Sequence, residues 1–246
     1  VLHNPPKRPR ISGVVCFLKG WSVALYFTGG TIWRSANSYA KSIRVEDGVI
    51  VDIDGASQTG DQLIDLKGCF LSPAFMDGHA HPLFAGRESQ GPSVNGLQSV
   101  EEIVAEVKRF ANSNPNVSWI IGGAYEASIV DSRDFLAEWL DVVVSDRPVV
   151  LHAADHHTIW VNSKALEIAG IGKSTPDPDG GSIERNADGT PRGTLREPSA
   201  INLITQHAPV RTIDEDVRAI KWACDRYLES GVTSAVDAWV EDRKST

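Results

Sequence analysis

The sequence has few cysteines, and their spacing excludes the sites that cysteines usually build. Three are present among 246 residues, Cys16, Cys69 and Cys224, and no two form a Cys-x-x-Cys pair. An odd number of widely separated thiols indicates neither a disulfide framework nor a thiolate zinc site. We therefore expect reduced, buried thiols and a cytoplasmic location.

Long hydrophobic runs and an excess of positive charge are also lacking. Lys19-Gly20 interrupts the apolar stretch of residues 11–28, so no run reaches the length of about 18 residues that a membrane helix needs. The formal net charge is -8, which disfavours binding to nucleic acid or to an anionic membrane. A small-molecule partner is the remaining expectation, and residues 1–22 are treated as an uncertain leader.

The composition that is present is that of a globular protein. Hydrophobic residues make up 41% and charged residues 23% of the chain. A (β/α)8 barrel of the TIM type typically takes about 250 residues, so this chain could form one large domain or two small ones.

Residues 23–70 have the pattern of short strands. The segments 42–45 and 49–53 alternate apolar and polar residues around Glu46-Asp47-Gly48, a turn in which glycine can adopt positive φ. Strands of this total length can hardly bury both faces of a sheet by themselves. We expect a partial β-sandwich domain that is completed by other segments.

From about residue 71 onward, strands alternate with helices. The predicted strands are 71–81, 119–123, 148–153 and 232–236, and the predicted helices are 99–111, 131–140, 162–169 and 213–229. This alternation predicts an α/β fold with a parallel sheet, either doubly wound or closed into a barrel. Only four strands of this kind are present, half of the eight in a closed barrel. Residues 176–197 read as a polar hairpin inserted outside the core.

A pair of histidines stands at the end of the first of these strands, in Asp77-Gly-His79-Ala-His81. Side chains alternate between the faces of a strand, so His79 and His81 are expected on one face of a buried strand. Neutral imidazole is a common ligand of zinc and similar ions. A His-x-His pair alone is a weak motif, however, and surface or core histidines are the alternative.

Further blocks carry a resemblance to a known family. The junction Pro73-Ala-Phe-Met-Asp-Gly-His79-Ala-His81-Pro82, the block 146–171 and the block 176–197 resemble the amidohydrolase superfamily. They are most similar to its amidohydrolase family 3 branch, which includes N-acyl-D-amino-acid deacylase-like proteins. Ala74, Gly78 and Arg196 depart from the residues common in this branch. The resemblance extends over roughly residues 23–238.

The resemblance implies a fold and a chemistry. The fold is the N-terminal half of a metal-dependent-hydrolase TIM-type barrel over residues 71–246, preceded by part of a small β-sandwich over residues 23–70. The chemistry is hydrolysis of carbon–nitrogen bonds other than peptide bonds, with a divalent metal ion, zinc above all, activating water. His79 and His81 correspond to the first two metal ligands. The family's later ligands, two histidines and an aspartate, have no counterpart among the motifs of this chain.

Two further residues become candidates through the same resemblance. Glu197 is the best candidate for a bridging metal ligand, because Arg196 stands where a lysine is common and arginine cannot be carbamylated. His157 is a candidate for substrate binding, with a hydrogen-bonded histidine in a strand-to-helix loop as the alternative. His152 and His156 are expected to have structural roles, and Asn162 is expected to cap a helix.

Two functional hypotheses therefore remain open. The first is a metal-dependent hydrolase, and the second is a non-catalytic fragment or binding module derived from one. The open sheet edges of half a barrel would favour association with a second copy of the chain. The sequence identifies neither the substrate nor the residues of the catalytic step.

Overall fold

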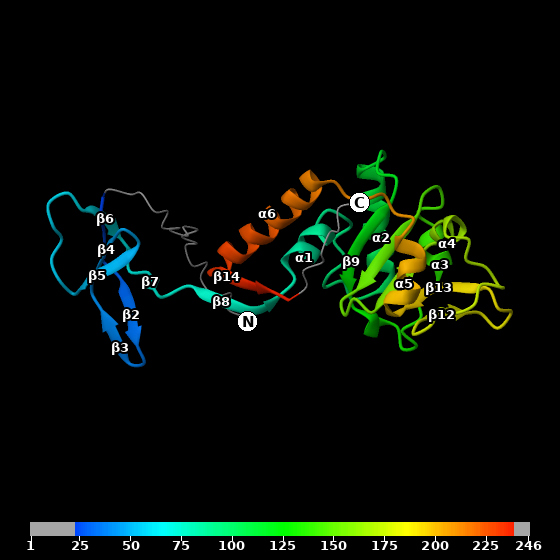
Figure 1. The fold of residues 1–246 in the computed structure, drawn as a ribbon, viewed down its shortest axis with the longest axis horizontal. Coiled ribbons are helices and arrows are strands. Elements are labelled where there is room, and N and C mark those ends of the chain that lie inside the picture. Colours follow the sequence, from blue (N-terminus) through cyan, green and yellow to red (C-terminus); the bar gives the residue numbers. More distant parts are fainter. Residues whose placement is uncertain (1–22, 239–246) are drawn as a thin grey trace, which may run out of the picture. The chain divides into compact units, whose positions relative to one another are not determined.

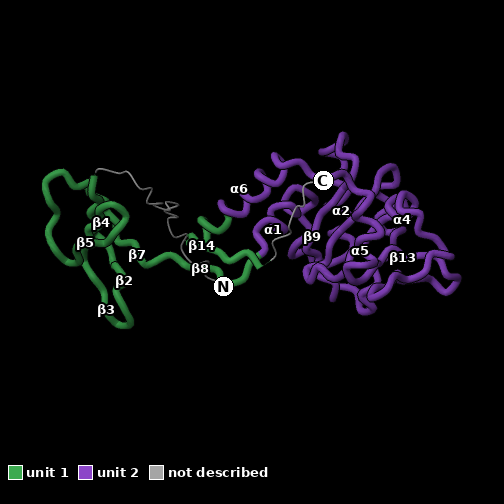
Figure 2. Tube along the Cα trace, in the orientation of Figure 1, with its two compact units in different colours: residues 1–80, 226–246 green, residues 81–225 purple. Residues whose placement is uncertain are grey.

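The computed structural model describes residues 23–238. The chain divides into two compact units, residues 1–80 with 226–246 (unit 1) and residues 81–225 (unit 2), which are coloured separately in Figure 2. The leader predicted for residues 1–22 lies outside the described part of the chain. None of the helices within residues 23–238 combines the length and the apolar character that crossing a bilayer requires.

Unit 1 begins with two small sheets. The four-stranded sheet has the order β5-β4-β1-β6, and the three-stranded sheet has the order β3-β2-β7 (Figure 1). The bounds are β1 Leu25–Thr28, β2 Thr31–Ser35, β3 Ser38–Ala40, β4 Ile43–Glu46, β5 Val49–Ile53, β6 Gln62–Asp65 and β7 Phe70–Leu71. Leu25, Phe27 and Val45 of the first sheet share one core with Ile32 and Ala40 of the second. The predicted strands are confirmed, and the two sheets are arranged as in a small sandwich.

A pair of parallel strands completes the described part of unit 1. β8 (Phe75–Ala80) pairs with β14 (Val232–Asp237), and the amide of Phe75 donates to the carbonyl oxygen of Gly231 at 2.9 Å. We expected a buried strand over residues 71–81, and this prediction is wrong in length and in burial. Phe75 is 66% exposed and Met76 67%, because among the described residues only β14 pairs with β8.

Unit 2 is built around a five-stranded sheet with the order β12-β13-β11-β10-β9. Its strands are β9 Ile120–Tyr125, β10 Val149–Ala153, β11 Thr158–Val161, β12 Ser182–Arg185 and β13 Pro191–Arg196. β9 and β10 are parallel, as predicted from the strand-helix alternation. β11 was not predicted, and it runs antiparallel to β10 and to β13.

Two of the main helices of unit 2, α2 and α4, begin at side-chain caps that the sequence supplies. Their bounds are α1 Pro82–Glu88, α2 Val100–Ser113, η1 Ala127–Ile129, α3 Ala137–Asp141, α4 Ser163–Ile168, α5 Glu197–Thr205 and α6 Ile213–Glu229, whose last turn belongs to unit 1. Ser99 accepts from the amide of Glu102, and Asn162 accepts from the amide of Ala165. The predicted cap at Asn162 is confirmed. The sequence patterns did not predict α1 and α5.

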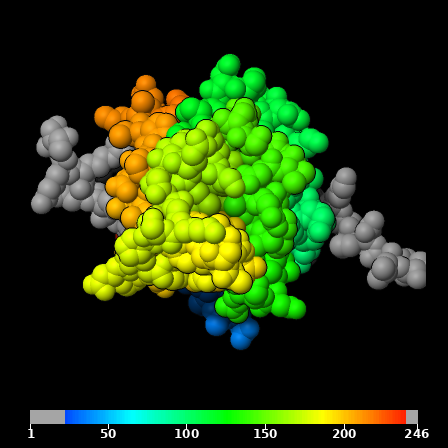
Figure 3. Space-filling model, turned by 90° about the vertical axis from the view of Figure 1, so that its right-hand side faces the viewer, coloured from blue at the N-terminus to red at the C-terminus, as the bar shows by residue number. Residues whose placement is uncertain are grey.

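Apolar clusters cover both faces of this sheet. Val149 and Leu151 of β10 join a cluster with α2, whereas Val150 joins a second cluster with α4 and α5, as strand alternation requires. Ile183 and Leu195 of the hairpin are buried in the second cluster. The expectation that the hairpin lies outside the core is therefore wrong, and the space-filling view shows its yellow segment lying directly against its neighbours (Figure 3).

The helix predicted over residues 131–140 is reduced to α3, which begins at Ala137. The preceding residues are bonded to the hairpin instead: the amide of Phe135 donates to Thr194 Oγ1 at 2.7 Å, and that hydroxyl donates to the carbonyl oxygen of Phe135. A helical backbone would have used these groups internally.

The free thiols also differ from expectation, since Cys69 is half-buried and Cys224 is exposed.

Candidate functional site at the carboxyl ends of the central strands

The candidate site residues of unit 2 gather where β9 and β10 end. Open parallel sheets bind ligands at the carboxyl ends of their strands, because the loops there present side chains to solvent. In this chain β9 ends at Tyr125, β10 ends at Ala153, and the antiparallel β13 brings Arg196 and Glu197 to the same edge through its pairing with β11.

A β-bulge re-aims the end of β9. Gly123 pairs with His152 and Tyr125 pairs with Ala153, so Ala124 is the extra residue, and its φ is 25°. Bulges of this kind occur next to active sites, where they change the direction of a side chain. The ring of Tyr125 is fully buried against Phe135, and burial raises the pKa of its hydroxyl.

Two predicted site residues meet at this edge. His157 Nδ1 lies 3.0 Å from Glu197 Oε2, and the amide of Glu197 donates to the carbonyl oxygen of His157 at 2.7 Å. The hydrogen bond with Glu197 and its negative charge raise the pKa of His157 above its ordinary value. His157 lies in the turn between β10 and β11, so the expected strand-to-helix loop is wrong.

A second group of titratable side chains lies beside this pair. Glu88 Oε1 of α1 is 3.6 Å from His156 Nδ1, and the rings of Phe84 and His152 lie 5.8 and 6.2 Å from the ring of His156. Burial raises the pKa of Glu88 to about 7. Burial, with a smaller contribution from His156, lowers the pKa of His152 to about 4, so His152 is neutral at pH 7.

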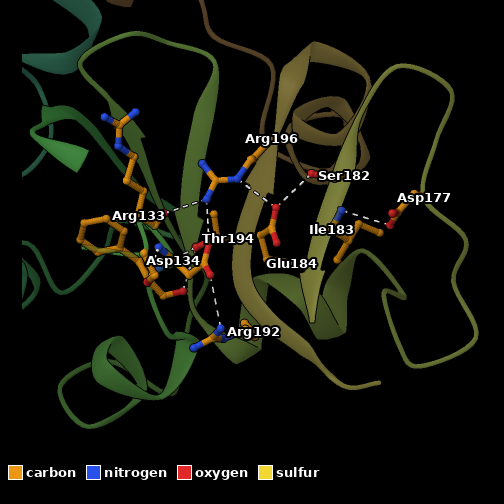
Figure 4. Close-up of polar contacts among 11 residues, drawn as sticks. Arg133, Asp134, Asp177, Ser182, Ile183, Glu184, Arg192, Thr194 and Arg196 are labelled. Atoms are coloured by element: carbon orange, nitrogen blue, oxygen red, sulfur yellow. Dashed lines mark hydrogen bonds and ion pairs between the residues drawn. The ribbon is translucent and has the colours of Figure 1, made fainter. Parts of the chain in front are cut away.

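The side chain of Arg196 is engaged in hydrogen bonds that join two segments of unit 2. Figure 4 shows its guanidinium between two carboxylates: Nε donates to Glu184 at 2.9 Å and Nη2 donates to Asp134 at 2.7 Å. Nη2 also donates to the carbonyl oxygen of Arg133, and Arg192 contacts the other oxygen of Asp134. These bonds fasten the loop before α3 to the hairpin. Glu197, the next residue, is left at the edge of the sheet.

Backbone strain is concentrated in the same region. Among the described residues of unit 2, the non-glycine residues with positive φ are Ala124, Arg133, His156 and Glu197. Each such conformation costs about 1–3 kcal/mol and persists where the surroundings impose it, often at functional sites. The backbone is therefore held in a strained conformation at His156 and Glu197, two residues whose side chains lie at this edge.

The two histidines of the His-x-His pair fall in different units. In unit 1, the amide of His79 donates to Asp77 Oδ1 at 3.0 Å. In unit 2, His81 stands at the N-cap position of α1 without a side-chain cap bond, and its carbonyl oxygen accepts from the amide of Ala85. The charge of His81 contributes to lowering the pKa of His156, after the larger effect of burial.

The donor set fits a divalent metal in kind but not in number. Imidazole nitrogens and a carboxylate are typical zinc ligands. Within residues 23–238, however, no three His, Cys, Asp or Glu side chains are placed to hold a metal ion together. Stable zinc sites usually have three or four protein ligands. The described residues therefore supply at most part of such a site.

Sequence reasoning missed Glu88. It lies in a short helix that the periodicity did not predict, and a lone Glu beside Arg87 looks like a solvated charge. The signal that could have revealed it is Gly122-Gly123, because paired glycines in a strand often mark the close approach of another group. Gly123 indeed makes room for the Glu88 carboxyl group.

Comparisons with known proteins identify sequence relatives of this chain. A family model described as the amidohydrolase family matches residues 62–246. An N-substituted formamide deformylase from Arthrobacter pascens is 32% identical over 217 residues, covering 83% of this chain and 40% of that protein. The protein LONG AFTER FAR-RED 3 from Arabidopsis thaliana is 30% identical over 221 residues, covering 87% of this chain and 38% of that protein.

A solved structure shows the same fold. An uncharacterized metal-dependent hydrolase from Pyrococcus furiosus aligns with a TM-score of 0.57 and 25% identity, over 86% of this chain and 43% of that one. The chain spans less than half the length of the curated relatives it matches, between 37% and 49% of four such proteins.

Proposed function

Because the chain belongs to the amidohydrolase family, we propose that it carries part of the active site of a metal-dependent hydrolase that cleaves carbon–nitrogen bonds other than peptide bonds. The observation that carries this proposal is the family match over residues 62–246, which includes His79, His81, His157 and Glu197. The meeting of His157 and Glu197 at the carboxyl ends of the strands supports it.

Each of these residues has a proposed role. His79 and His81 would hold a divalent metal ion, zinc by the nature of the donors, and Glu197 would be a third donor. When bound, such an ion acts as a Lewis acid toward water and the substrate carbonyl group. His157 would contact the substrate from the β10–β11 turn, where its hydrogen bond to Glu197 fixes the orientation of the ring.

The family membership also supports proposals about the whole barrel, the class of substrate and the location of the protein. The remaining ligands and strands would be those of the longer relatives, so that β8, β9, β10 and β14 would belong to one TIM-type barrel. The substrate would be a small molecule, since an acidic chain is poorly suited to nucleic acid. The free thiols of Cys69 and Cys224 support a cytoplasmic location.

A second candidate function is a non-catalytic binding module. It is favoured by one observation, the lack of a metal-binding group of three side chains within residues 23–238. In that case the strands would serve as a surface for another chain rather than as the support of a reaction centre.

Metal analysis distinguishes the two. We expect the purified chain, dialysed against dilute zinc, to retain less than one equivalent, since two imidazoles and one carboxylate bind weakly. The double variant His79→Ala and His81→Ala should lose this zinc, whereas His207→Ala, at the end of α5, should keep it. Zinc retention that is unchanged in the double variant would refute the proposed ligands, and no retention in any variant would favour the binding module.

A further inference from the structure

The carboxyl group of Glu88 lies beside the candidate site, and the absence of a side chain at Gly123 makes room for it. Glu88, the last residue of α1, lies over β9 at Gly123, where a Cβ would collide with the carboxyl oxygen Oε1. The side chain of Glu88 is only 17% exposed. An acidic residue at the end of a helix is usually solvated, so burial over a strand that makes room for it points to a specific partner.

The imidazole of His156 lies close to this carboxyl group. The distance from Glu88 Oε1 to His156 Nδ1 is 3.6 Å, and the His156 side chain is 37% exposed. His156 has a φ of 58°, a left-handed conformation that a non-glycine residue seldom adopts. The rings of Phe84 and His152 both lie next to the ring of His156. Backbone and packing therefore hold the ring close to Glu88.

The two nitrogens of a neutral imidazole have complementary roles. When Nδ1 carries the proton and donates a hydrogen bond to a carboxylate, Nε2 is left with a free electron pair. A carboxylate behind a histidine fixes this tautomer and raises the basicity of Nε2. Contacts of this kind are often slightly long in the free protein and tighten in the functional complex.

We propose that Glu88 and His156 form a carboxylate–imidazole dyad in which Glu88 is the positioning residue and His156 Nε2 accepts a proton at this site. The donor would be the attacking water: its O–H bond breaks, the proton forms a bond with Nε2, and Glu88 stabilises the resulting imidazolium. The chemical step rests on the proposed hydrolase function. The dyad itself is a property of this chain and can be tested without metal or substrate.

The charges around His156 are compatible with this role. Besides Glu88 of α1, which lies 3.6 Å away, the titratable groups near His156 are His81 before α1, His152 of β10, and Asp155 and His157 of the β10–β11 turn. Burial, followed by His81, lowers the pKa of His156, so its ring is neutral and able to accept a proton at pH 8.5. His152 is held neutral by burial, so it does not compete for the proton of His156 at neutral pH. The carboxyl group of Glu88 titrates at about 7, so it is an anion at pH 8.5.

The test is the tautomer of His156, measured by ¹⁵N NMR on the full chain at pH 8.5. The His156 signals are assigned by their loss in His156→Asn, since asparagine tolerates the left-handed backbone. We expect the Nδ1–H form to predominate in the wild type and the Nε2–H form, preferred by free imidazole, to predominate in Glu88→Leu. Gly123→Ala should give the same change, because the added methyl group displaces the carboxyl group without removing it.

Matched controls separate this effect from a general disturbance. Glu101→Leu removes an exposed carboxylate from α2, and Gly172→Ala adds a methyl group where no atom lies within 4 Å. Both should keep the wild-type tautomer. An Nε2–H tautomer in the wild type, or an Nδ1–H tautomer that persists in folded Glu88→Leu and Gly123→Ala, would overturn the proposal. Neither outcome depends on zinc, so failure here and failure of the hydrolase function remain distinguishable.

Discussion

Single residues hold the segments around the candidate site in place, and Asn162 shows how. Its carboxamide oxygen accepts from the amides of Val149 and Ala165, and its nitrogen donates to the carbonyl oxygens of Val144 and Arg147. The side chain is fully buried, and all four of its hydrogen bonds are made. One residue thus joins the start of β10, the start of α4 and the loop before β10.

We expect Asn162→Ala to lower the free energy of unfolding by roughly 3 kcal/mol, because it removes a helix cap and leaves buried backbone groups unpaired. Urea denaturation followed by circular dichroism measures the change. Asn186→Ala, in the exposed turn between β12 and β13, is the control and should change stability by less than about 1 kcal/mol. Equal effects of the two substitutions would contradict this account.

Glu88 makes a separate prediction about pH. Its pKa is about 7 in the folded chain against an ordinary value of 4.5, so the folded state holds the proton more tightly than the unfolded state. The stability that this proton contributes is complete below pH 4.5 and is lost as the pH rises through 7. Glu88→Gln, which stays neutral, should therefore gain about 2 kcal/mol relative to the wild type between pH 4.5 and 8, allowing for partial exposure.

Denaturant unfolding at several pH values checks this prediction, with Glu101→Gln as the control. The difference between wild type and Glu88→Gln should change with pH, whereas the difference between wild type and Glu101→Gln should stay constant over the same range. A Glu88→Gln difference that is independent of pH would show that the carboxyl group has its ordinary pKa.

The sequence predicted individual candidate residues, but it did not predict which residues contact one another. Glu197 and His157 were both candidates, yet they are 40 positions apart, and only the pairing of β11 with β13 brings them together. No local pattern specifies such a pairing. Glu88 was missed because its burial depends on Gly123, a residue of another element.

Among the elements, the loop before α3 is shaped by the hairpin rather than by its own sequence. Thr194 of β13 is fully buried, and its hydroxyl bonds both the amide and the carbonyl oxygen of Phe135. Asp134 is held by Arg192 and Arg196 (Figure 4). The loop therefore adopts the conformation that β13 imposes, which turns Phe135 into the aromatic cluster with Tyr125 and Trp160.

Thr194→Val tests this dependence with little change of shape. We expect the free energy of unfolding to fall by about 2 kcal/mol, because the amide of Phe135 loses its partner in a buried setting. Hydrogen exchange should show that amide exchanging at least tenfold faster than in the wild type. The control Thr205→Val, at the end of α5, should leave the exchange rate of the Phe135 amide unchanged. An unchanged rate in Thr194→Val would show that the loop is held by other contacts.

The sequence predicted helices where the apolar periodicity and the capping residues agree. The predictions failed for segments whose conformation is set by contacts with distant parts of the chain. α2, α4 and α6 were predicted close to their observed bounds because each has an amphipathic pattern and a recognisable end. β11 was missed, since a short apolar run next to a helix cap can be read as a loop. The helix predicted over residues 131–140 was shortened because the hairpin offered stronger partners to its first half.

For the molecule as a whole, the exposed strands of unit 1 predict association. Phe75 and Met76 of β8 are about two-thirds exposed and Val236 of β14 is about half exposed, and the outer edges of these strands have no partner strand among the described residues. Apolar strands with open edges pair with other chains. We expect the chain to self-associate or to be poorly soluble at low micromolar concentration, as light scattering or sedimentation would measure.

The substitution Met76→Glu should reduce this association, whereas Val142→Glu, at an exposed position after α3, should not. A charge on the exposed face disfavours stacking and pairing of strands without disturbing a core. A compact wild-type monomer that unfolds cooperatively and binds no hydrophobic dye would mean that these strands are not association surfaces.

The pairing of β8 with β14 also bears on how the chain is made. Phe75 pairs beside Val232, and the whole of unit 2 lies between them in the sequence. On the ribosome, β8 emerges long before its partner, and the intervening unit can complete its own core during that interval. Closing so distant a contact is slow, and unit 2 shortens the effective loop once it has folded. Synthesis should therefore produce a folded unit 2 first, with unit 1 acquiring its last strand only when translation has passed residue 237.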